Sequence, residues 1–449
     1  MLMRTVSGLR GIVGTDLTPE ALVRHTQAFL QVVKAKKIAI GRDSRVTGPA
    51  ISRMVSSVCE LAGVDVIDLG LATTPTVEMA VEQMECDGGI IVTASHNPAE
   101  WNALKLLNSD GTFLVQKQVD ELIRIADSGP HPWASWDKIG HLESFKDADR
   151  LHIDAILALP WFNLDLIRSK KFKVAIDAVN GAGCFIFTKL LRELGCDVAE
   201  LNVVPNGIFP RGAEPIPESL VELGRVVKEN GCIIGFASDP DSDRCALVSE
   251  KGRAVGEEYT LAMAVDLILS KAEGDVAVNL STSRMIDEVA KRYNRKVYRT
   301  KVGEINVTEV LREKNCIIGG EGNGGVILPS LHAGRDGVLA TALVLQWLAE
   351  RESTLEDFVS NLPPYVMSKG KVSSEGLDVK AICSALKKNW PTAQLTEIDG
   401  LKLDLPEGWI HVRSSNTEPI VRIMAESALP GKAKELAQKA SEIISSLNG

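Results

Sequence analysis

The sequence lacks closely paired cysteines and an excess of basic charge. Its eight cysteines form no C-x-x-C and lie mostly in apolar runs, which is typical of buried, reduced thiols in a cytosolic protein. With 50 Lys and Arg against 59 Asp and Glu, the net charge of -9 argues against nucleic acid or an acidic membrane as the main partner. An anionic small substrate is still compatible with this charge, because local basic loops can bind it.

Long hydrophobic segments are also missing. The N-terminus, MLMRTVSGLRG, has no sustained apolar core, so we expect no secretory signal. The most apolar stretch, YTLAMAVDLILS at 259–270, carries Asp266 and is too short to span a bilayer. Hydrophobic content of 45% and charged content of 24% are ordinary for a soluble globular protein. We therefore predict a cytoplasmic protein, and 449 residues suffice for about three or four domains.

Three parts of the chain repeat one order of elements: strand, helix, strand, helix, strand. The last strand of each part leads into an unusual polar loop: TASHNP at 93–98, DPDSDR at 239–244 and GEGNGG at 320–325. The alternation predicts α/β layers with mostly parallel sheets. Because function collects at the carboxyl ends of strands in such sheets, we expect the three loops to converge on one central cleft.

After about Pro363 the pattern changes. One helix, several short strands and a closing helix predict a separate small α+β domain, whose polar loop is RSSNTEP at 413–419. The predicted fold is thus three similar α/β domains with mixed, mostly parallel sheets, plus a smaller C-terminal α+β domain around the cleft. The predicted boundaries are 1–150, 151–252, 253–363 and 364–449.

The DPDSDR loop places three acids at alternate positions: Asp239, Asp241 and Asp243. Their carboxylates can meet at one point, where a hard divalent cation would relieve their repulsion, and an oxygen-only ligand set suits Mg²⁺. A solvated acidic turn is the alternative, but the loop directly ends an apolar strand, which favours a metal. An EF-hand is excluded, because the glycine and glutamate of that motif are missing. Arg244 either braces the acids or holds a phosphate.

Ser95 lies on a tight turn, because Pro98 ends the preceding apolar strand and removes an N–H. The G-x-S-x-G elbow of an α/β-hydrolase is absent. A serine near a metal and a phosphate loop suggests phosphoryl transfer instead. Lys105 is a candidate general acid–base if nearby cations or burial lower its pKa, and otherwise a surface lysine. A lone histidine such as His96 is more often structural.

The two remaining loops are open to two interpretations each. RSSNTEP offers a guanidinium, hydroxyls, an amide and backbone N–H groups, which match a phosphate, but an ordinary hydrophilic hairpin has the same composition. GEGNGG lets the backbone approach a ligand closely, and Glu321 with Asn323 could hold neighbouring hydroxyls; a flexible turn is the alternative. This loop is neither a P-loop nor a dinucleotide fingerprint.

With these four loops in this order, the chain resembles the α-D-phosphohexomutase superfamily, which includes phosphoglucomutase, phosphomannomutase and phosphoglucosamine mutase. The resemblance covers nearly the whole chain, and the joint occurrence of TASHNP, DPDSDR and RSSNTEP is highly specific. It implies that Ser95 carries the phosphoryl group and that the Ser95 phosphate binds Mg²⁺ together with Asp239, Asp241 and Asp243.

The resemblance also assigns the other site residues. Those around the phosphoserine are Arg10, His96, Lys105 and Arg244; the sugar-hydroxyl contacts are Glu321 and Asn323; the holders of the non-reacting phosphate are Arg413, Ser415, Asn416 and Thr417; and the specificity loop contains Lys301. The implied reaction passes the phosphoryl group from the serine to a hexose 6-phosphate or 1-phosphate. The resulting 1,6-bisphosphate turns around in the cleft, and its other phosphate returns to the serine. We expect a monomer or homodimer whose partner is the hexose phosphate.

The sugar loop departs from the family pattern. Many relatives carry serine and histidine in a G-E-x-S-G-H loop, where this chain has Asn323 and Gly325. G-E-G-N-G-G resembles versions in chains classed as phosphoglucosamine mutase or as mixed phosphomannomutase/phosphoglucomutase. We therefore predict glucosamine phosphate as the substrate, with mannose and glucose phosphates as the alternative.

Two other classes compete with a mutase. A phosphatase with an aspartate nucleophile in DPDSD would leave TASHNP structural, but Asp243 stands where that superfamily's pattern has Thr or Val. A sugar-phosphate sensor without turnover would need neither a nucleophile nor a metal, so the presence of Ser95, the three acids and Lys105 disfavours it.

Overall fold

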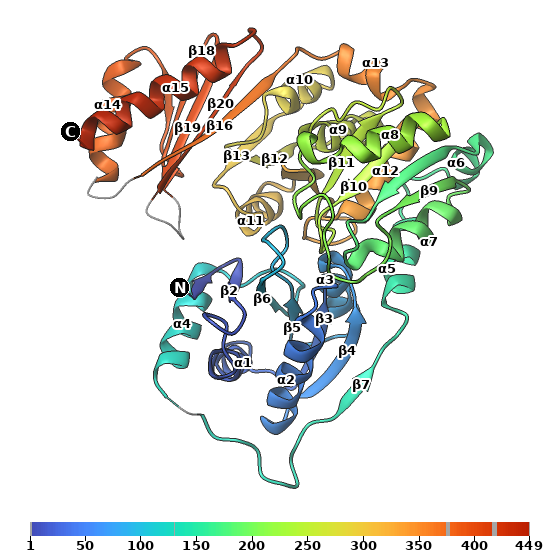
Figure 1. Ribbon diagram of the computed structural model, residues 1–449, viewed down its shortest axis with the longest axis vertical. Coiled ribbons are helices and arrows are strands. Elements are labelled where there is room, and N and C mark those ends of the chain that lie inside the picture. Colours follow the sequence, from blue (N-terminus) through green and yellow to red (C-terminus); the bar gives the residue numbers. More distant parts are fainter. Residues whose placement is uncertain (1, 130, 374–377, 415–419, 449) are drawn as a thin grey trace.

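The computed structural model describes residues 2–129, 131–373, 378–414 and 420–448. In Figure 1 the N-terminal part lies below, the second and third parts lie side by side above it, and the C-terminal part lies beyond the third. No helix in these ranges is long and apolar enough to cross a membrane.

The first part is a seven-stranded sheet in the order β1-β2-β6-β5-β3-β4-β7 with four helices. Its elements are β1 (Met3–Thr5), β2 (Gly8–Ile12), α1 (Pro19–Val32), β3 (Lys37–Arg42), α2 (Gly48–Leu61), β4 (Asp65–Leu71), α3 (Thr74–Gln83), β5 (Gly88–Val92), β6 (Trp101–Asn108), α4 (Gln116–Asp127) and β7 (Leu142–Ser144). Strand β5, GGIIV, is buried along its whole length, which explains its continuous apolar sequence.

The second and third parts each contain a four-stranded sheet, in the orders β11-β10-β8-β9 and β13-β12-β14-β15. The second part consists of α5 (Ala148–Leu157), α6 (Leu164–Lys170), β8 (Lys173–Asp177), α7 (Ile186–Glu193), β9 (Asp197–Leu201), α8 (Val221–Asn230), β10 (Ile234–Ser238) and β11 (Cys245–Ser249). The third consists of α9 (Glu258–Lys271), β12 (Val276–Asn279), α10 (Met285–Arg292), β13 (Val297–Thr300), α11 (Glu304–Lys314), β14 (Ile318–Glu321), β15 (Gly325–Ile327), α12 (Gly337–Arg351) and α13 (Leu355–Ser360).

The C-terminal part is an antiparallel five-stranded sheet, β16-β20-β19-β18-β17, with two helices. Its elements are β16 (Val366–Ser373), α14 (Val379–Asn389), β17 (Gln394–Thr396), β18 (Leu401–Leu405), β19 (Gly408–Ser414), β20 (Ile420–Ser427) and α15 (Lys432–Ser445). Together with the three α/β parts, it confirms the predicted fold class.

The threefold repeat is confirmed at the level of strand pairing. In each α/β part the first strand of the repeat lies between two parallel neighbours, and the last parallel strand turns back into an antiparallel one: β5 into β6, β10 into β11 and β14 into β15. The three polar loops are these three reversals. Equivalent topology therefore delivers TASHNP, DPDSDR and GEGNGG to equivalent sheet edges.

One hydrophobic core joins the second and third parts. It runs from Ile153 to Leu362 and includes residues of both sheets and of α9 and α12. These two helices are buried on nearly all sides, so they pack against both neighbours instead of covering one sheet. The predicted boundary between residues 252 and 253 separates the sequence repeats but does not separate two cores.

His332 joins the first and third parts. Its Nε2 lies 3.2 Å from Asp336 Oδ2, and its Nδ1 lies 3.4 Å from Glu78 Oε2 in α3. Burial alone would lower the pKa of His332, but the two carboxylates raise it to about 10. The N–H of Gly334 also points at Nδ1 from 3.1 Å. Two facing carboxylates outweigh one backbone N–H, so we assign this buried ring as an imidazolium at neutral pH.

Replacing His332 by glutamine should therefore lower the free energy of unfolding by about 1.5–3 kcal/mol, because Asp336 loses a charged hydrogen-bond partner and Glu78 loses its ion-pair partner. The folded-state pKa lies above the ordinary 6.5, so the loss should be full below pH 6.5 and should shrink as the pH rises towards about 10. Chemical unfolding of both proteins across this pH range measures it. The control is His131→Gln, at a half-buried histidine. A loss independent of pH would contradict the charge assignment.

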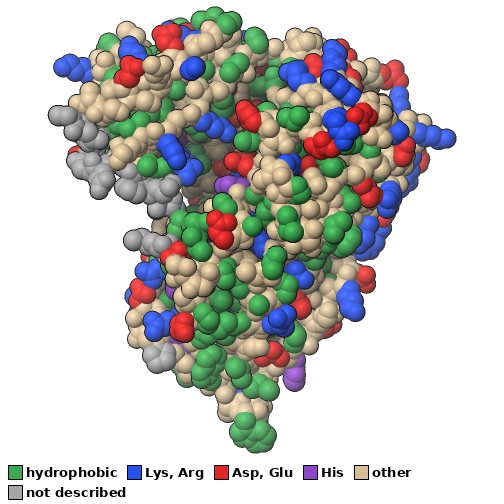
Figure 2. All heavy atoms as spheres, in the orientation of Figure 1, with side chains coloured by type: hydrophobic (Ala, Val, Ile, Leu, Met, Phe, Trp, Pro, Cys, Tyr) green, Lys and Arg blue, Asp and Glu red, His purple; other side chains and the backbone are tan. Residues whose placement is uncertain are grey.

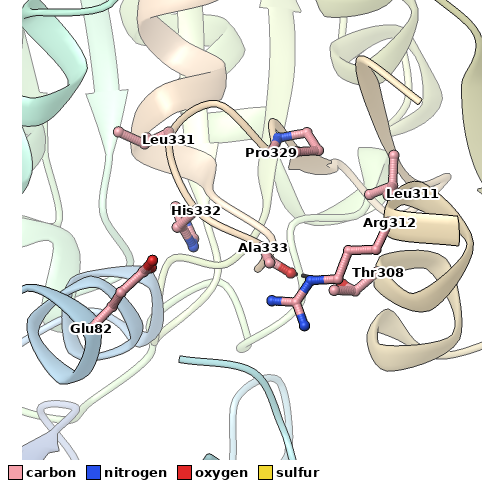
Figure 3. Close-up of a pocket in the computed structure, with 8 residues that line it drawn as sticks. All are labelled: Glu82, Thr308, Leu311, Arg312, Pro329, Leu331, His332 and Ala333. Atoms are coloured by element: carbon pink, nitrogen blue, oxygen red, sulfur yellow. Dashed lines mark hydrogen bonds between the residues drawn. The ribbon is translucent and has the colours of Figure 1, made fainter. Parts of the chain in front are cut away.

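A pocket of about 190 Å³ opens beside this contact. It is lined by Glu82, Thr308, Leu311, Arg312, Pro329, Leu331, His332 and Ala333. Figure 3 shows Glu82 of α3 and Arg312 of α11 on either side of the loop that carries His332. None of the residues predicted from the sequence as site residues lines it, so this pocket is distinct from the site predicted at the three loops. Figure 2 shows a hollow at the middle of one face, with side chains of both charges on its walls.

Candidate active site

Ser95 lies where the first and second parts meet. Its backbone has φ +49°, in the left-handed region that is unusual for a serine. Its N–H donates to Thr93 Oγ1 at 2.9 Å, and its Oγ donates to Asp239 Oδ2 at 2.9 Å. Since Asp239 lies 144 residues further along the chain, the fold brings the TASHNP and DPDSDR loops into direct contact. The serine side chain is buried and its hydroxyl faces a carboxylate of the aspartate loop.

The three aspartates converge. One carboxylate oxygen from each of Asp239, Asp241 and Asp243 lies within 4.8 Å of the others, and all three residues are fully buried. Asp241 Oδ1 and Asp243 Oδ1 have no hydrogen-bond partner among the described residues. Buried carboxylate oxygens without partners are costly unless something else satisfies them. The donor set fits a divalent cation with oxygen ligands, because each partnerless atom can serve as a ligand.

Lys105 and Thr74 hold the other oxygen of Asp241. Lys105 Nζ donates to Oδ2 at 2.6 Å, and Thr74 Oγ1 donates to the same atom at 2.7 Å. Lys105 also lies 3.4 Å from Asp243 Oδ2. From the sequence, Lys105 is a candidate general acid–base on the condition that burial or nearby cations lower its pKa. Burial does act in that direction, but the two aspartates outweigh it and raise the pKa. Lys105 is therefore a buried ammonium and not the surface lysine of the alternative interpretation.

Three further residues predicted from the sequence surround Ser95. Arg244 donates to His96 Nδ1 at 3.1 Å, and the positive charge of Arg244, followed by burial, lowers the pKa of His96 well below its usual range. His96 Nδ1 also lies 3.3 Å from Ser95 Oγ. Arg10 donates to Asn97 in the same loop at 3.1 Å. The Arg244 guanidinium approaches Asp243 Oδ1 at 3.6 Å, so it braces the acids while its other end faces His96.

Arg335 ties the GEGNGG loop, called the sugar loop after its predicted role, to the DPDSDR loop, called the metal loop. Glu321 accepts hydrogen bonds from Asn279 Nδ2 at 2.7 Å, from Gly303 N–H at 2.9 Å and from Arg335 Nη1 at 2.7 Å. Burial would raise the pKa of Glu321, but the Arg335 charge and these hydrogen bonds lower it. Asn323 Oδ1 accepts the Gly325 N–H within the loop at 3.2 Å, and its amide N–H₂ makes no hydrogen bond to a described residue. That group is free to meet a ligand.

The remaining predicted residues lie in the third and C-terminal parts. Arg413 is the penultimate residue of β19, is partly buried, and lies close enough to Glu321 for their charges to interact. Lys301 is exposed in the loop before α11. Ser415, Asn416 and Thr417 lie outside the described residues. The structure thus brings together the residues predicted around Ser95, in the DPDSDR loop and in the GEGNGG loop. Of the residues predicted to hold the non-reacting phosphate, it describes only Arg413.

A buried pair of charged residues, not predicted from the sequence, supports the loop that carries Ser95. Arg45 follows β3 and is 1% exposed; its Nε donates to Asp43 Oδ2 at 3.0 Å. The rest of its guanidinium donates to four backbone carbonyls: those of Ser95, Asn97 and Pro98 in the loop after β5, and that of Trp101, the first residue of β6. The only signal in the sequence was a charged pair directly after an apolar strand, which also fits an exposed turn.

Comparison with known proteins agrees with this geometry. Four models of the phosphoglucomutase/phosphomannomutase family match the chain: α/β/α domain I over 2–131, domain II over 150–252, domain III over 256–365 and the C-terminal domain over 368–443. A phosphoglucomutase/phosphomannomutase from Thermococcus kodakarensis is 37% identical over 440 residues, which cover 95% of both chains. The chain belongs to the phosphoglucomutase/phosphomannomutase family. It is a phosphohexomutase by family, and the recognition of the α-D-phosphohexomutase superfamily from the sequence is confirmed.

Relatives within the family carry more than one name. A probable phosphoglucosamine mutase from Methanopyrus kandleri is 35% identical over 98% of this chain and 96% of its own. Among solved structures, a phosphoglucomutase/phosphomannomutase family protein from Burkholderia thailandensis has a TM-score of 0.83 at 23% identity and covers 99% of this chain and 98% of its own. The N-acetylphosphoglucosamine mutase of Aspergillus fumigatus, solved with GlcNAc-6P and magnesium, has a TM-score of 0.62 at 14% identity, with 99% and 95% coverage. These structures show that the fold is shared.

Proposed function

We propose that this phosphohexomutase carries its phosphoryl group on Ser95 and interconverts the 6-phosphate and 1-phosphate of a hexose, with glucosamine phosphate as the preferred substrate. The observation that carries the proposal is the contact between Ser95 Oγ and Asp239 Oδ2 at 2.9 Å, within a triad of converging aspartates. A nucleophilic hydroxyl and a cation site in contact are what a transferable phosphoryl group needs.

The cation of this proposal is Mg²⁺. Asp239, Asp241, Asp243 and the phosphate on Ser95 would hold it, and the partnerless oxygens of Asp241 and Asp243 support this ligand set. The related fungal mutase that was solved with magnesium points to the same ion. When bound, the cation neutralises charge on the phosphoryl oxygens.

The side chains around the serine then have distinct tasks. Phosphoryl transfer breaks the bond from Ser95 Oγ to phosphorus and forms one from a sugar oxygen to phosphorus. Meanwhile the sugar hydroxyl loses a proton and Ser95 Oγ gains one. Lys105 remains our candidate for handling these protons, as an ammonium that donates first, because the aspartates raise its pKa instead of lowering it. Arg10 and Arg244 supply positive charge beside the serine loop. A 1,6-bisphosphate, the product of the first transfer, has to turn around before the second.

The two ends of the substrate would meet different parts of the chain. Glu321 is held by three donors, so its carboxylate has one fixed orientation and can accept from sugar hydroxyls in either substrate orientation. Arg413, with Ser415, Asn416 and Thr417, would hold the phosphate that does not react. Lys301 would approach from the loop before α11. The amide of Asn323 is the group that we assign to the C2 or C3 substituent, because it offers an acceptor and two donors.

Phosphate labelling of Ser95 tests this function. After incubation with a hexose 1,6-bisphosphate, the label should lie on Ser95 and resist hydroxylamine, as a phosphomonoester does, and it should be absent from Ser95→Ala. The matched control is Ser56→Ala, at a buried serine of α2, which should be labelled normally. A hydroxylamine-sensitive label on Asp239 or Asp241 would establish the phosphatase alternative, and no label or turnover with any hexose phosphate would establish a sensor.

Exchange of Asn323 for serine should change the choice of sugar. We expect the ratio of kcat/KM for glucosamine 6-phosphate to kcat/KM for mannose 6-phosphate to fall about tenfold. This change corresponds to the loss of one hydrogen bond that contributes roughly 1.4 kcal/mol. Labelling of Ser95 by the bisphosphate should persist, because Asn323 lies in the sugar loop and its side chain bonds within that loop. Glucose and N-acetylglucosamine phosphates complete the panel. An unchanged ratio would move selectivity to the loop around Lys301.

A further inference from the structure

Arg335 binds three carboxylates that come from three functionally different segments. Its Nη2 donates to Asp243 Oδ2 at 2.6 Å, its Nη1 to Glu321 Oε2 at 2.7 Å and its Nε to Glu304 Oε2 at 2.9 Å. Asp243 belongs to the DPDSDR loop, Glu321 to the sugar loop, and Glu304 begins α11 directly after the loop of Lys301. Every nitrogen of the guanidinium is therefore used, with one carboxylate each.

The position of Arg335 is fixed from both ends. Its side chain is 11% exposed, and the next residue, Asp336, caps α12 by accepting the N–H groups of Val338 and Leu339. At the other end the three carboxylates surround the guanidinium. A planar guanidinium with five N–H donors can span three carboxylates in this way, whereas the compact ammonium of a lysine cannot.

Gly325 makes room for this arrangement. A Cβ at Gly325 would lie 2.3 Å from Arg335 Cδ and 2.9 Å from its Cγ, far inside van der Waals contact. Any side chain at position 325 would therefore displace the stem of Arg335. Gly325 stands where the G-E-x-S-G-H pattern has histidine. The Arg335 side chain packs on this glycine.

We propose that Arg335 is a positioning residue that fixes Glu321 relative to the Asp243 side of the metal loop, and that Gly325 is required for it. The proposal rests on the proposed function in two assignments, that of Glu321 to the sugar and that of Asp243 to the cation. Arg335 holds Asp243 Oδ2, whereas Asp243 Oδ1 makes no hydrogen bond to a described residue and lies 3.6 Å from the Arg244 guanidinium. By holding Glu321 Oε2, Arg335 orients the sugar-loop carboxylate with the guanidinium that holds Asp243.

This role predicts a joint effect on two ligands. In Arg335→Ala, the dissociation constant of Mn²⁺, measured by electron paramagnetic resonance, should rise about tenfold or more, and KM for the hexose phosphate should rise by a similar factor, since each site loses a charged hydrogen bond. Arg335→Lys should recover little of either. The control is Arg253→Met, which removes an arginine whose guanidinium donates to Glu356, away from the three loops; both constants should stay within about twofold.

Gly325→Ala provides the second test, because it displaces Arg335 while the guanidinium is retained. It should raise both constants in the same direction as Arg335→Ala, and adding Gly325→Ala to Arg335→Ala should have no further effect, since the stem is already gone. This variant also keeps the proposal testable if Arg335→Ala does not fold. Additive effects of the two changes, or a lower melting temperature with both constants unchanged, would overturn the proposal. Wild-type protein without mutase activity would overturn the proposed function and leave the Mn²⁺ result to decide on Arg335.

Discussion

Asp241→Asn should reduce turnover by roughly three decades while the protein stays folded. The substitution keeps the size of the side chain and removes the charge from a carboxylate whose Oδ1 has no partner among the described residues. A carboxylate lost from a cation site of three acids removes several kcal/mol of charge stabilisation in the transition state, and about 4 kcal/mol corresponds to three decades in rate. The measurement is kcat with a saturating hexose 1-phosphate and Mg²⁺, with Mn²⁺ affinity measured separately.

The control for this experiment is Asp266→Asn. Asp266 is also buried, and it accepts hydrogen bonds from Trp347 and Tyr293 in the core of α9 and α12, away from the three loops. That variant should lose stability but keep its kcat within a few-fold. If wild-type protein retained full activity in excess EDTA, or if Asp241→Asn bound Mn²⁺ as wild type does, the metal assignment would be wrong.

The repeat and its loops were predictable because their signals are local. The run of Gly88 to Val92 followed by Pro98 defines a strand that must end, and alternate aspartates after an apolar strand define a carboxylate cluster. Three such segments in one order predicted the common topology of β5, β10 and β14. Local sequence and family pattern together placed Ser95 beside Asp239, although 144 residues separate them.

The parts that sequence could not predict depend on contacts between distant residues. Arg45 reaches Ser95 across 50 residues and Arg335 reaches Asp243 across 92, and neither arginine lies in a motif that marks such a contact. The pKa of Lys105 shows the same limit. Burial and cations act to lower it, but the distances to Asp241 and Asp243, which only the fold sets, reverse the direction.

Arg45→Met should destabilise the first part of the molecule by about 3–5 kcal/mol, because it leaves the buried charge of Asp43 without its partner. It should also slow phosphorylation of Ser95 by at least about tenfold. Arg45 donates to four carbonyls of the serine loop, which runs from Thr93 to Trp101 at the start of β6. Its loss therefore frees a loop in which Ser95 has φ +49°. The control is Arg4→Met, at an ion pair with Asp127 near the surface, which should cost less than about 1 kcal/mol.

The double variant Asp43→Asn with Arg45→Met separates the two effects. Removing both members of a buried ion pair leaves no unpaired charge, so part of the lost stability should return. Thr93 Oγ1, which accepts the Ser95 N–H and donates to Asp43 Oδ2, would still find an acceptor in the amide oxygen of the introduced asparagine. The four loop carbonyls would remain without their donor, so phosphorylation of Ser95 should stay slow. Recovery of both stability and phosphorylation would show that Arg45 acts only by neutralising Asp43 and does not hold the serine loop.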